Sequence, residues 1–377
     1  MHILISPNAF KNSLDATAGA TAIKEGLQQS RLSFTATCFP IGDGGDGTGK
    51  LLTERCFGTF VSTETIDPLG RKINASFGLI DDDKTAVIEM ASASGLHLLQ
   101  SNELNPLLAS SYGTGIQMVK ALDKGVTKIL LCVGGSATVD GGCGILEALG
   151  ARFLDKNGNA LTGMPAGLIN LYSIDYSGLD TRIHNCECII LCDVANTLLG
   201  PNGAATVFGP QKGASEKEVR QLESCLTQFN HVVLETRGID ISALKHGGAA
   251  GGTVAGLCAF LNARPVNGID HFLDITEFDK SLGEADLLIT GEGSIDLQTL
   301  EGKAPYGVAV RAKKKNIPVI VLAGKVPDKI NPLLNDFFDV LLAIGHTPTD
   351  IASALISTRD DLFRTAMQLG NLLAMKR

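Results

Sequence analysis

The sequence predicts an α/β fold in which a doubly wound parallel-sheet domain is interrupted by a second, inserted α/β domain. Three observations lead to this prediction. Short apolar runs alternate with helical periods at both ends of the 377-residue chain, a pattern typical of a parallel sheet covered on both faces. Strands in the middle of the chain are less regular and the loops there are longer. The length suits about two domains of roughly 150 residues each.

The N-terminal segment has the pattern strand, helix, strand. The first strand is expected at Ile3–Ile5 and the second at Phe34–Phe39. Between them, apolar residues recur at spacings of four, three and four, which predicts an amphipathic helix. These residues are Ala16, Ala20, Ile23 and Leu27.

The C-terminal segment repeats this alternation. Strands are expected at 286–289, 319–322 and 340–342, with a helix around Val308 and Ala312 between the first two. The last helix carries its apolar residues on one face. They are Leu355, Leu362, Ala366, Leu369 and Leu373.

The two regular segments are assigned to one discontinuous domain, residues 1–67 plus 285–377, and residues 68–284 to the inserted α/β domain. The inserted domain contains less regular strands and the long loops at 155–171 and 201–212. Ligands of such folds bind beyond the carboxyl ends of the strands and between domains. We therefore expect the site in an interdomain cleft.

Composition excludes several classes of function. The net charge is −8 and only 19% of residues are charged, which argues against a nucleic-acid or anionic-membrane surface, because both need basic patches. No apolar run approaches 18 residues and the N-terminus does not resemble a signal peptide. The nine cysteines are scattered, mostly in apolar runs, as in a reducing compartment. We expect a cytoplasmic protein; its oligomeric state is not predicted.

Glycine is enriched, with 43 residues, or about 11% against an average near 7%. The glycines cluster at 42–49, 134–144, 247–252 and 291–293. Glycine lets backbone amides approach a ligand closely, so the clusters suggest a ligand rich in anionic oxygen atoms. Tight turns between strands and helices would explain some of them without a ligand.

The stretch 41–51, IGDGGDGTGKL, satisfies two nucleotide-binding patterns at once. From Gly42 it matches the dinucleotide fingerprint, and from Gly44 it matches a P-loop without its final hydroxyl residue, because Leu51 stands there. Asp43 and Asp46 would repel phosphate in either case. An acidic, glycine-rich loop suits a metal ion, a substrate hydroxyl or a proton acceptor better, and a simple turn after a strand is the structural alternative.

Two further glycine-rich stretches suit anions. Residues 134–144, GGSATVDGGCG, follow an expected strand and precede a helix, which is a favourable place for phosphate. Residues 246–253, HGGAAGGT, fit either a second such site or a close helix packing contact. Lys11 lies before the first helix, where a cation opposes the helix dipole; it serves either a ligand or the solvent.

Carboxylates end two of the expected strands. Residues 290–296, TGEGSID, place Glu292 and Asp296 beyond one strand, and Lys303 follows near the next helix. This combination suits Mg²⁺ with phosphate. Asp193 ends another strand, and Lys212 lies in the constrained turn GPQKG. Anion loops, strand-end carboxylates and isolated lysines together favour phosphoryl transfer.

Nine motifs, in this order, resemble the first type of the glycerate kinase family over essentially the whole chain. They are SPNAFKNSL at 6–14, DGGDGT at 43–48, DPLGR at 67–71, EMASASGL at 89–96, YGTG at 112–115, GGSATVDGGCG at 134–144, GPQKGA at 209–214, GAAGGT at 248–253, and TGEGSID with QT and GK at 290–303. The family commonly has Asp, Glu and Asn where this chain has Asn8, Asp46 and Val139. We assign no acid, base or metal role to Asn8.

The resemblance implies a Rossmann-like domain with an inserted domain, and a kinase that makes 2-phosphoglycerate from D-glycerate and ATP. Within that frame, charge and placement suggest the roles. Asp193 would act on the attacking hydroxyl, Lys11 and Lys212 would neutralise charge, and Glu292 and Asp296 would hold Mg²⁺. Substrate contacts are expected from Asp43, Gly44, Gly45, Asp46, Thr48, Arg71, Ser136 and Lys303. Phosphate contacts are expected from Gly134, Gly135, Ser136, Thr138, Gly251 and Gly252.

Two other classes of function fit the same sequence. One is a nicotinamide-dependent oxidoreductase of a small hydroxy acid, built on the GDGGDG pattern at 42–47. The other is a non-catalytic protein that senses glycerate and regulates a partner.

Overall fold

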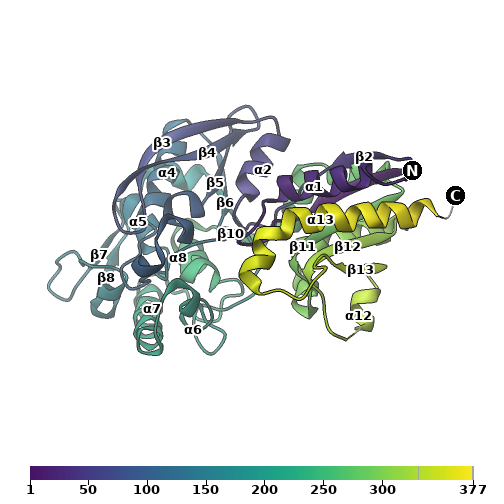
Figure 1. Ribbon diagram of the computed structural model, residues 1–377. Coiled ribbons are helices and arrows are strands. Elements are labelled where there is room, and N and C mark those ends of the chain that lie inside the picture. Colours follow the sequence, from purple (N-terminus) through teal and green to yellow (C-terminus); the bar gives the residue numbers. More distant parts are fainter. Residues whose placement is uncertain (330, 376–377) are drawn as a thin grey trace. The chain divides into compact units, whose positions relative to one another are not determined.

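The computed structural model describes residues 1–329 and 331–375. The chain forms two compact units, the first from Met1–Asp43 and Ile269–Arg377 and the second from Gly44–Gly268. Figure 1 shows their helices and strands. In the described ranges, no helix is both long and apolar enough to cross a membrane.

The first unit is built on a five-stranded sheet, and all of its neighbouring strands are parallel. The order is β13-β12-β11-β1-β2, so the first two strands along the chain lie together and the other three extend from the opposite side of β1. This is the doubly wound order, with its switch point between β1 and β11. The strands are β1 (His2–Pro7), β2 (Thr35–Cys38), β11 (Leu287–Ser294), β12 (Val319–Lys325) and β13 (Val340–Ala343).

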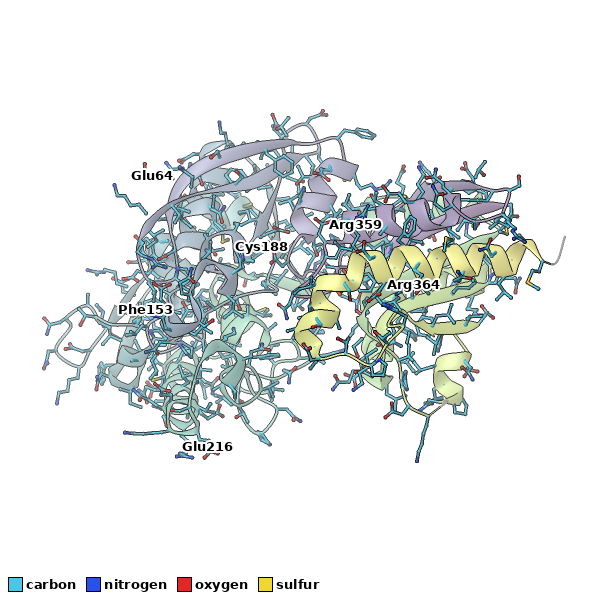
Figure 2. The ribbon with its side chains drawn as sticks, viewed as in Figure 1. Glu64, Phe153, Cys188, Glu216, Arg359 and Arg364 are labelled. Carbon is cyan, nitrogen blue, oxygen red and sulfur yellow. The ribbon has the colours of Figure 1, made fainter. Side chains whose placement is uncertain are left out.

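Helices α1 (Ala16–Gln28) and α13 (Ile351–Ala374) pack against each other on one face of this sheet, side by side in purple and yellow in Figure 1. Asp15 caps α1 by accepting the Ala18 amide at 2.7 Å, and helix starts favour such acceptors. Arg359 of α13, labelled with Arg364 in Figure 2, donates to Glu25 of α1 at 2.7 Å. Apolar side chains of β1, β11 and β12 form a core with these helices.

Four more helices lie in the described part of the first unit. They are α9 (Gly268–Ile275), α10 (Phe278–Gly283), α11 (Ala304–Lys314) and α12 (Pro332–Asn335). Phe278 of α10 packs edge-on against Phe39 with ring centroids 5.0 Å apart. Arg311 of α11 donates to Asp274 and Asp279, which joins α11 to α9 and α10.

The second unit has a six-stranded sheet of order β10-β9-β6-β5-β4-β3. Strands β5, β6, β9 and β10 are parallel, whereas β3 and β4 add antiparallel at one edge. The strands are β3 (Thr59–Ile66), β4 (Lys72–Ile80), β5 (Thr85–Glu89), β6 (Lys128–Cys132), β9 (Glu187–Cys192) and β10 (Arg264–Asn267). Strands β7 (Arg152–Leu154) and β8 (Ser173–Asp175) form a separate antiparallel pair.

Seven helices surround the larger sheet within the described part of the second unit. They are α2 (Thr48–Arg55), α3 (Ala91–Ser94), α4 (Tyr112–Asp123), α5 (Cys143–Ala148), α6 (Ala204–Phe208), α7 (Glu216–Arg237) and α8 (Thr253–Leu261). Phe229 of α7 is completely buried in the core of this unit. Cys188 and Cys192 line the same core, and burial raises the pKa of each thiol to about 12, so both stay protonated.

These findings confirm the predicted α/β class with parallel sheets. The compact units change over at residues 43/44 and 268/269, whereas the sequence-based boundaries lie at 67/68 and 284/285. The difference has a structural origin at both places. β3 pairs with β4 in the second sheet, and α9 and α10 contact α11 in the first unit.

Candidate active site

In the first unit, the strand-end residues that the sequence singles out meet at the switch point of the sheet. β1 and β11 are neighbours, with Pro7 paired to Gly291, and the Asn8 amide donates to the Gly291 carbonyl oxygen at 2.8 Å. Lys11 therefore follows β1, and Glu292 lies near the carboxyl end of β11 at the same edge. In doubly wound sheets this edge is where ligands bind.

Glu292 is the most perturbed carboxylate of this group. Its side chain is only 8% exposed, and burial raises its pKa to about 7; nearby Asp43 and Asp296 add to the rise, and Lys303 and Lys11 oppose it. The Thr299 hydroxyl lies 3.5 Å from Glu292 Oε1, at the limit of a hydrogen bond. A buried carboxylate with so little compensation gains from a bound cation.

Two residue pairs near Glu292 complete this polar group. Asn8 Nδ2 donates to Asp43 Oδ2 at 3.0 Å, and both side chains are buried. Lys303 Nζ lies 3.9 Å from Asp296 Oδ1, an enclosed oxygen atom without a hydrogen-bond partner in the described ranges. Lys303 stands at the N-cap of α11, where a cation opposes the helix dipole.

The donor set of the first unit suits Mg²⁺. Among residues 1–329 and 331–375, no group of three or more His, Cys, Asp or Glu side chains is arranged to hold a metal. Mg²⁺ is commonly bound by only one or two carboxylates, together with water and substrate phosphates. Glu292 with its raised pKa and Asp296, whose Oδ1 has no hydrogen-bond partner in the described ranges, provide such a pair.

In the second unit, the predicted substrate loop lies against the predicted phosphate loop. The Gly134 amide donates to the Gly44 carbonyl oxygen at 2.9 Å. Gly44 has φ of +96°, and a Cβ there would lie 2.4 Å from the carbonyl oxygen of Leu191 in β9. The loop therefore covers the carboxyl ends of β6 and β9, and Asp193, directly after β9, is partly buried beside it.

Lys212 is buried behind the glycine loop. Its side chain is 3% exposed, and Nζ donates to Ser136 Oγ at 2.9 Å and to the Thr138 carbonyl oxygen at 2.7 Å. Burial lowers its pKa to about 7, against the opposing charge of Asp140. Gly135 is exposed at the surface of the same loop, whereas Thr138 is fully buried.

Gly251 and Gly252 form a packing contact with residues 138–142. Gly251 accepts a hydrogen bond from the Gly141 amide at 3.0 Å, and a Cβ on Gly251 would lie 2.0 Å from the Thr138 carbonyl oxygen. Both glycines are buried and have positive φ. Of the two interpretations of the HGGAAGGT stretch, the geometry favours close packing.

The start of α2 is occupied by a carboxylate of the protein. The Gly49 amide donates to Glu89 Oε1 at 2.6 Å, and the amides of Gly47 and Lys50 also bond to Glu89. In a P-loop or a dinucleotide fold, phosphate takes this place at the helix N-terminus. The 41–51 stretch therefore forms neither of these two sites in this structure.

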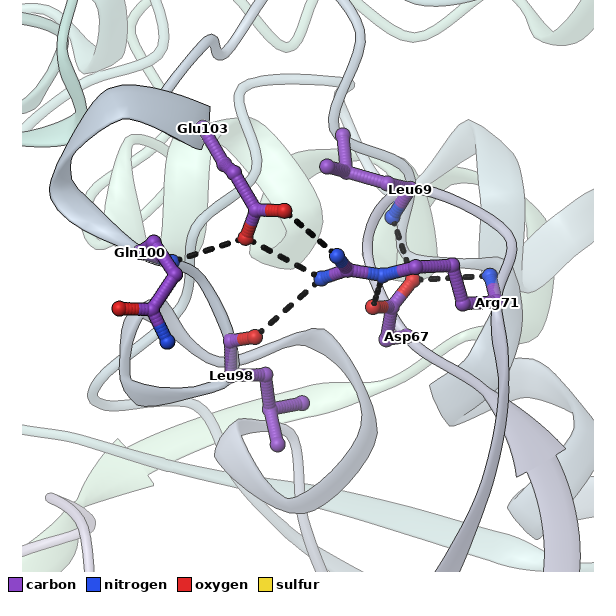
Figure 3. A network of polar contacts seen from close by, with 6 residues as sticks. All are labelled: Asp67, Leu69, Arg71, Leu98, Gln100 and Glu103. Carbon is purple, nitrogen blue, oxygen red and sulfur yellow. Dashed lines mark hydrogen bonds and ion pairs between the residues drawn. The ribbon is translucent and has the colours of Figure 1, made fainter.

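Asp46 and Arg71, both predicted to contact substrate, differ in their surroundings. Asp46 is exposed, with His97 Nδ1 3.9 Å from its carboxylate. Arg71 is engaged within the protein: Nε donates to Asp67 Oδ2 at 2.5 Å and Nη1 to Glu103 Oε1 at 2.6 Å. Figure 3 shows these ion pairs, with Nη2 directed at the Leu98 carbonyl oxygen. Arg71 thus ties the β3–β4 turn to the segment around Glu103.

Two residues near the site received no role from the sequence. Asp140 is buried and accepts the Ser111 hydroxyl at 2.6 Å and the Gly142 amide at 3.0 Å, so it holds the end of the glycine loop. Glu89 holds the start of α2. A signal for Glu89 existed, because it ends a strand as Asp193 does. Asn8 was assigned no acid, base or metal role, and here it supports Asp43.

The fold defines an α/β protein with parallel sheets, and a polar cluster lies at the carboxyl ends of the strands in each unit. The chain belongs to the glycerate kinase family, whose family model matches residues 3–374. This finding confirms the resemblance carried by the nine motifs.

Relatives agree over the full chain length. A glycerate 2-kinase of Escherichia coli K12 is 39% identical over 376 residues, covering 100% of this chain and 98% of the relative. A glycerate kinase of Haemophilus influenzae is 40% identical over 376 residues, with complete coverage of both chains. A crystal structure from Salmonella typhimurium LT2, described with the name glycerate kinase 2, superposes with a TM-score of 0.82 at 40% identity, covering 100% of this chain and 99% of that one.

Proposed function

We propose that this protein transfers the γ-phosphoryl group of ATP to the 2-hydroxyl of D-glycerate, giving 2-phosphoglycerate and ADP. The observation that carries the proposal is the buried Glu292, surrounded by Asp43, Asp296, Lys11 and Lys303 at the switch point of the first sheet. Carboxylates for a cation and ammonium groups for anionic oxygens are what phosphoryl transfer requires. Family membership over the whole chain supports the same reaction.

The residues of the first unit would bind phosphate groups and the metal ion. Lys11 and Lys303 would neutralise phosphate or carboxylate charge, and Glu292 with Asp296 would hold Mg²⁺. When bound, the ion would supply positive charge that offsets the charge of the phosphate oxygens. Asn8 would keep the Asp43 carboxylate oriented through its hydrogen bond at 3.0 Å.

The residues of the second unit would take the substrate hydroxyl and further anionic oxygens. Asp193 would accept the proton of the attacking hydroxyl, a role that an aspartate also fills in protein kinases. Gly44, Gly45, Asp46 and Thr48 would contact the substrate directly or support that contact. Gly135 and Ser136 would offer an amide and a hydroxyl to anionic oxygens, with Lys212 behind Ser136. Gly134 would support this contact, because its amide holds the Gly44 carbonyl oxygen.

The oxidoreductase alternative receives less support. A nicotinamide dinucleotide would need the helix N-terminus after the GDGGDG pattern for its pyrophosphate. Glu89 accepts the amide hydrogen bonds there, and a carboxylate in that place repels phosphate.

The test is ³¹P NMR of the product after incubation with ATP, Mg²⁺ and D-glycerate. The expected product is the 2-phosphate, recognised by the phosphorus coupling to a single methine proton. A 3-phosphate, which couples to two methylene protons, would correct the position of transfer. If no phosphoglycerate forms and no ATP is consumed, even at high enzyme concentration, the proposal is refuted.

A further inference from the structure

The EMASASGL motif received no role from the sequence, yet its first residue makes a specific contact. Glu89 is the last residue of β5 and is partly buried. Its carboxylate accepts the amide of Gly49 at 2.6 Å, and the amides of Gly47 and Lys50 also lower the pKa of Glu89. The carboxylate thus satisfies the Gly49 amide, which the helix start leaves without an intrahelical partner.

The fit between Glu89 and Gly49 is close. A Cβ on Gly49 would lie 2.6 Å from Glu89 Cγ and 3.2 Å from its Oε1. Only glycine leaves room for this carboxylate against the first turn of α2. The contact therefore depends on both residues.

The start of α2 is in turn coupled to the predicted substrate loop. The Gly44 amide donates to Thr48 Oγ1, in the first turn of α2, at 3.1 Å. The carbonyl oxygen of Gly44 accepts the Gly134 amide at 2.9 Å. Displacement of the helix start would therefore move Gly44, Asp46 and the contact with the phosphate loop together.

Ionisation of the Glu89 carboxylate is disfavoured at this place, whereas a neutral side chain would carry no such penalty. Burial raises the pKa of Glu89, and Asp46 raises it further, while the amides of α2 oppose the rise. The helix dipole favours a negative charge at this end of α2.

We propose that Glu89 is a positioning residue for the glycerate side of the reaction: it anchors the start of α2 and thereby holds the loop Gly44–Thr48 in the conformation that receives the substrate, without touching the substrate itself. This inference rests on the proposed function, because it assigns the loop to D-glycerate.

Steady-state kinetics of three variants test the inference. Glu89→Ala removes every bond to the helix start, and we expect the KM for D-glycerate to rise at least tenfold while the KM for ATP stays within twofold. Glu89→Gln keeps an acceptor oxygen, so the rise should be smaller than for alanine. The control is Glu54→Gln, because Glu54 lies on the same helix, is half exposed and pairs only weakly with Lys50 at 3.9 Å; its KM values should not change.

A double-mutant cycle makes the test specific for the contact. Gly49→Ala alone should raise the KM for D-glycerate, because its methyl group displaces the Glu89 side chain. In the Glu89→Ala background the same change meets no carboxylate, so its added effect should be less than twofold. Equal rises in both KM values, unchanged KM values, or full additivity of Gly49→Ala and Glu89→Ala would each overturn the inference. Should Glu89→Ala not fold, Glu89→Gln and Gly49→Ala still decide the question.

Hydrogen exchange separates failure of this inference from failure of the proposed function. If the wild type does not phosphorylate D-glycerate, the function is wrong, and exchange at the amides of Gly47, Gly49 and Lys50 then decides whether Glu89 anchors the loop. We expect exchange at these amides to be at least tenfold faster in Glu89→Gln or Glu89→Ala than in wild type, and unchanged in Glu54→Gln. Equal exchange in all four proteins would contradict the anchoring role.

Discussion

Lys212 Nζ lies 2.9 Å from Ser136 Oγ, inside a part of the second unit where the lysine side chain is only 3% exposed. The same nitrogen donates to the Thr138 carbonyl oxygen at 2.7 Å. The amino group of Lys212 therefore holds the glycine loop in place through these two hydrogen bonds. A catalytic contact with phosphate stays a prediction, and such a contact would require the loop to open.

Lys212→Met tests these hydrogen bonds. We expect at least a tenfold fall in kcat/KM, because Ser136 and Thr138 lose a shared donor and the loop loses its shape. Since the pKa of Lys212 is lowered to about 7 from 10.5, the unfolded chain binds a proton that the folded protein lacks between these values. The stability of the wild type should therefore rise with pH from about 7 to 10.5, relative to the methionine variant. Denaturant unfolding at several pH values measures this, and parallel curves for the two proteins would argue against a buried, neutral lysine.

Glu292→Gln tests the perturbed carboxylate of the first unit. The folded protein holds a proton that the unfolded chain releases between pH 4.5 and about 7, so the stability of the metal-free wild type falls as pH rises through this window and levels off above it. The variant has no such titration. Its free energy of unfolding, relative to that of the wild type, should therefore increase by up to roughly 3 kcal/mol across the window, at 1.36 kcal/mol per pKa unit.

The same variant tests the metal assignment. Loss of a carboxylate ligand should increase the Mg²⁺ concentration needed for half-maximal turnover at least tenfold, whereas Glu54→Gln should leave it unchanged. A Mg²⁺ requirement equal to that of wild type would remove Glu292 from the metal site.

Asp193→Asn tests the proposed proton acceptor. The amide keeps the size of the side chain but cannot accept a proton, so we expect kcat to fall roughly a hundredfold or more with little change in the KM for ATP. Glu187→Gln is the matched control, because Glu187 lies at the opposite end of the same strand and pairs with Arg264 at 3.1 Å on the surface. Near-normal kcat in Asp193→Asn would assign the proton transfer to another group.

Gly251→Ala tests the packing interpretation of the HGGAAGGT stretch. Gly251 has φ of +67° and its Cβ would lie 2.0 Å from the Thr138 carbonyl oxygen, so the variant should lose at least roughly 3 kcal/mol of unfolding free energy. Gly238→Ala has a similar φ of +70° with no atom within 4 Å of the added Cβ, and should lose only about 1 to 2 kcal/mol. Comparable losses in both would show that Gly251 is not tightly packed.

Much of the fold followed from periodicity. The continuous apolar run at Ile3–Ile5 and that at 286–289 predict buried parallel strands, and both lie in the first sheet. The boundaries between the two units could not be predicted as well, because the residue pattern of β3 does not show which sheet this strand joins. Its partner β4 is set by side chains and a turn that fix the hairpin.

The candidate site was predicted in its residue types more than in its contacts. Glu292, Asp296 and Lys303 were grouped because they are close in sequence, and the structure keeps them near one another. Arg71 was assigned to the substrate on its charge alone. Only the packed structure brings Glu103 to within 2.6 Å of it, and that ion pair occupies the guanidinium.

By itself, the sequence determined the alternation of strands and helices at both ends of the chain, the carboxylates near two strand ends, and the motif order that resembles the glycerate kinase family, because these depend on neighbouring residues and on motif order. The tertiary structure decided which distant groups meet. Asn8 reaches Asp43, Glu89 reaches the amide of Gly49, and Lys212 reaches Ser136. Each of these contacts depends on strand order and on the path of the connecting loops, and local side-chain periodicity encodes neither.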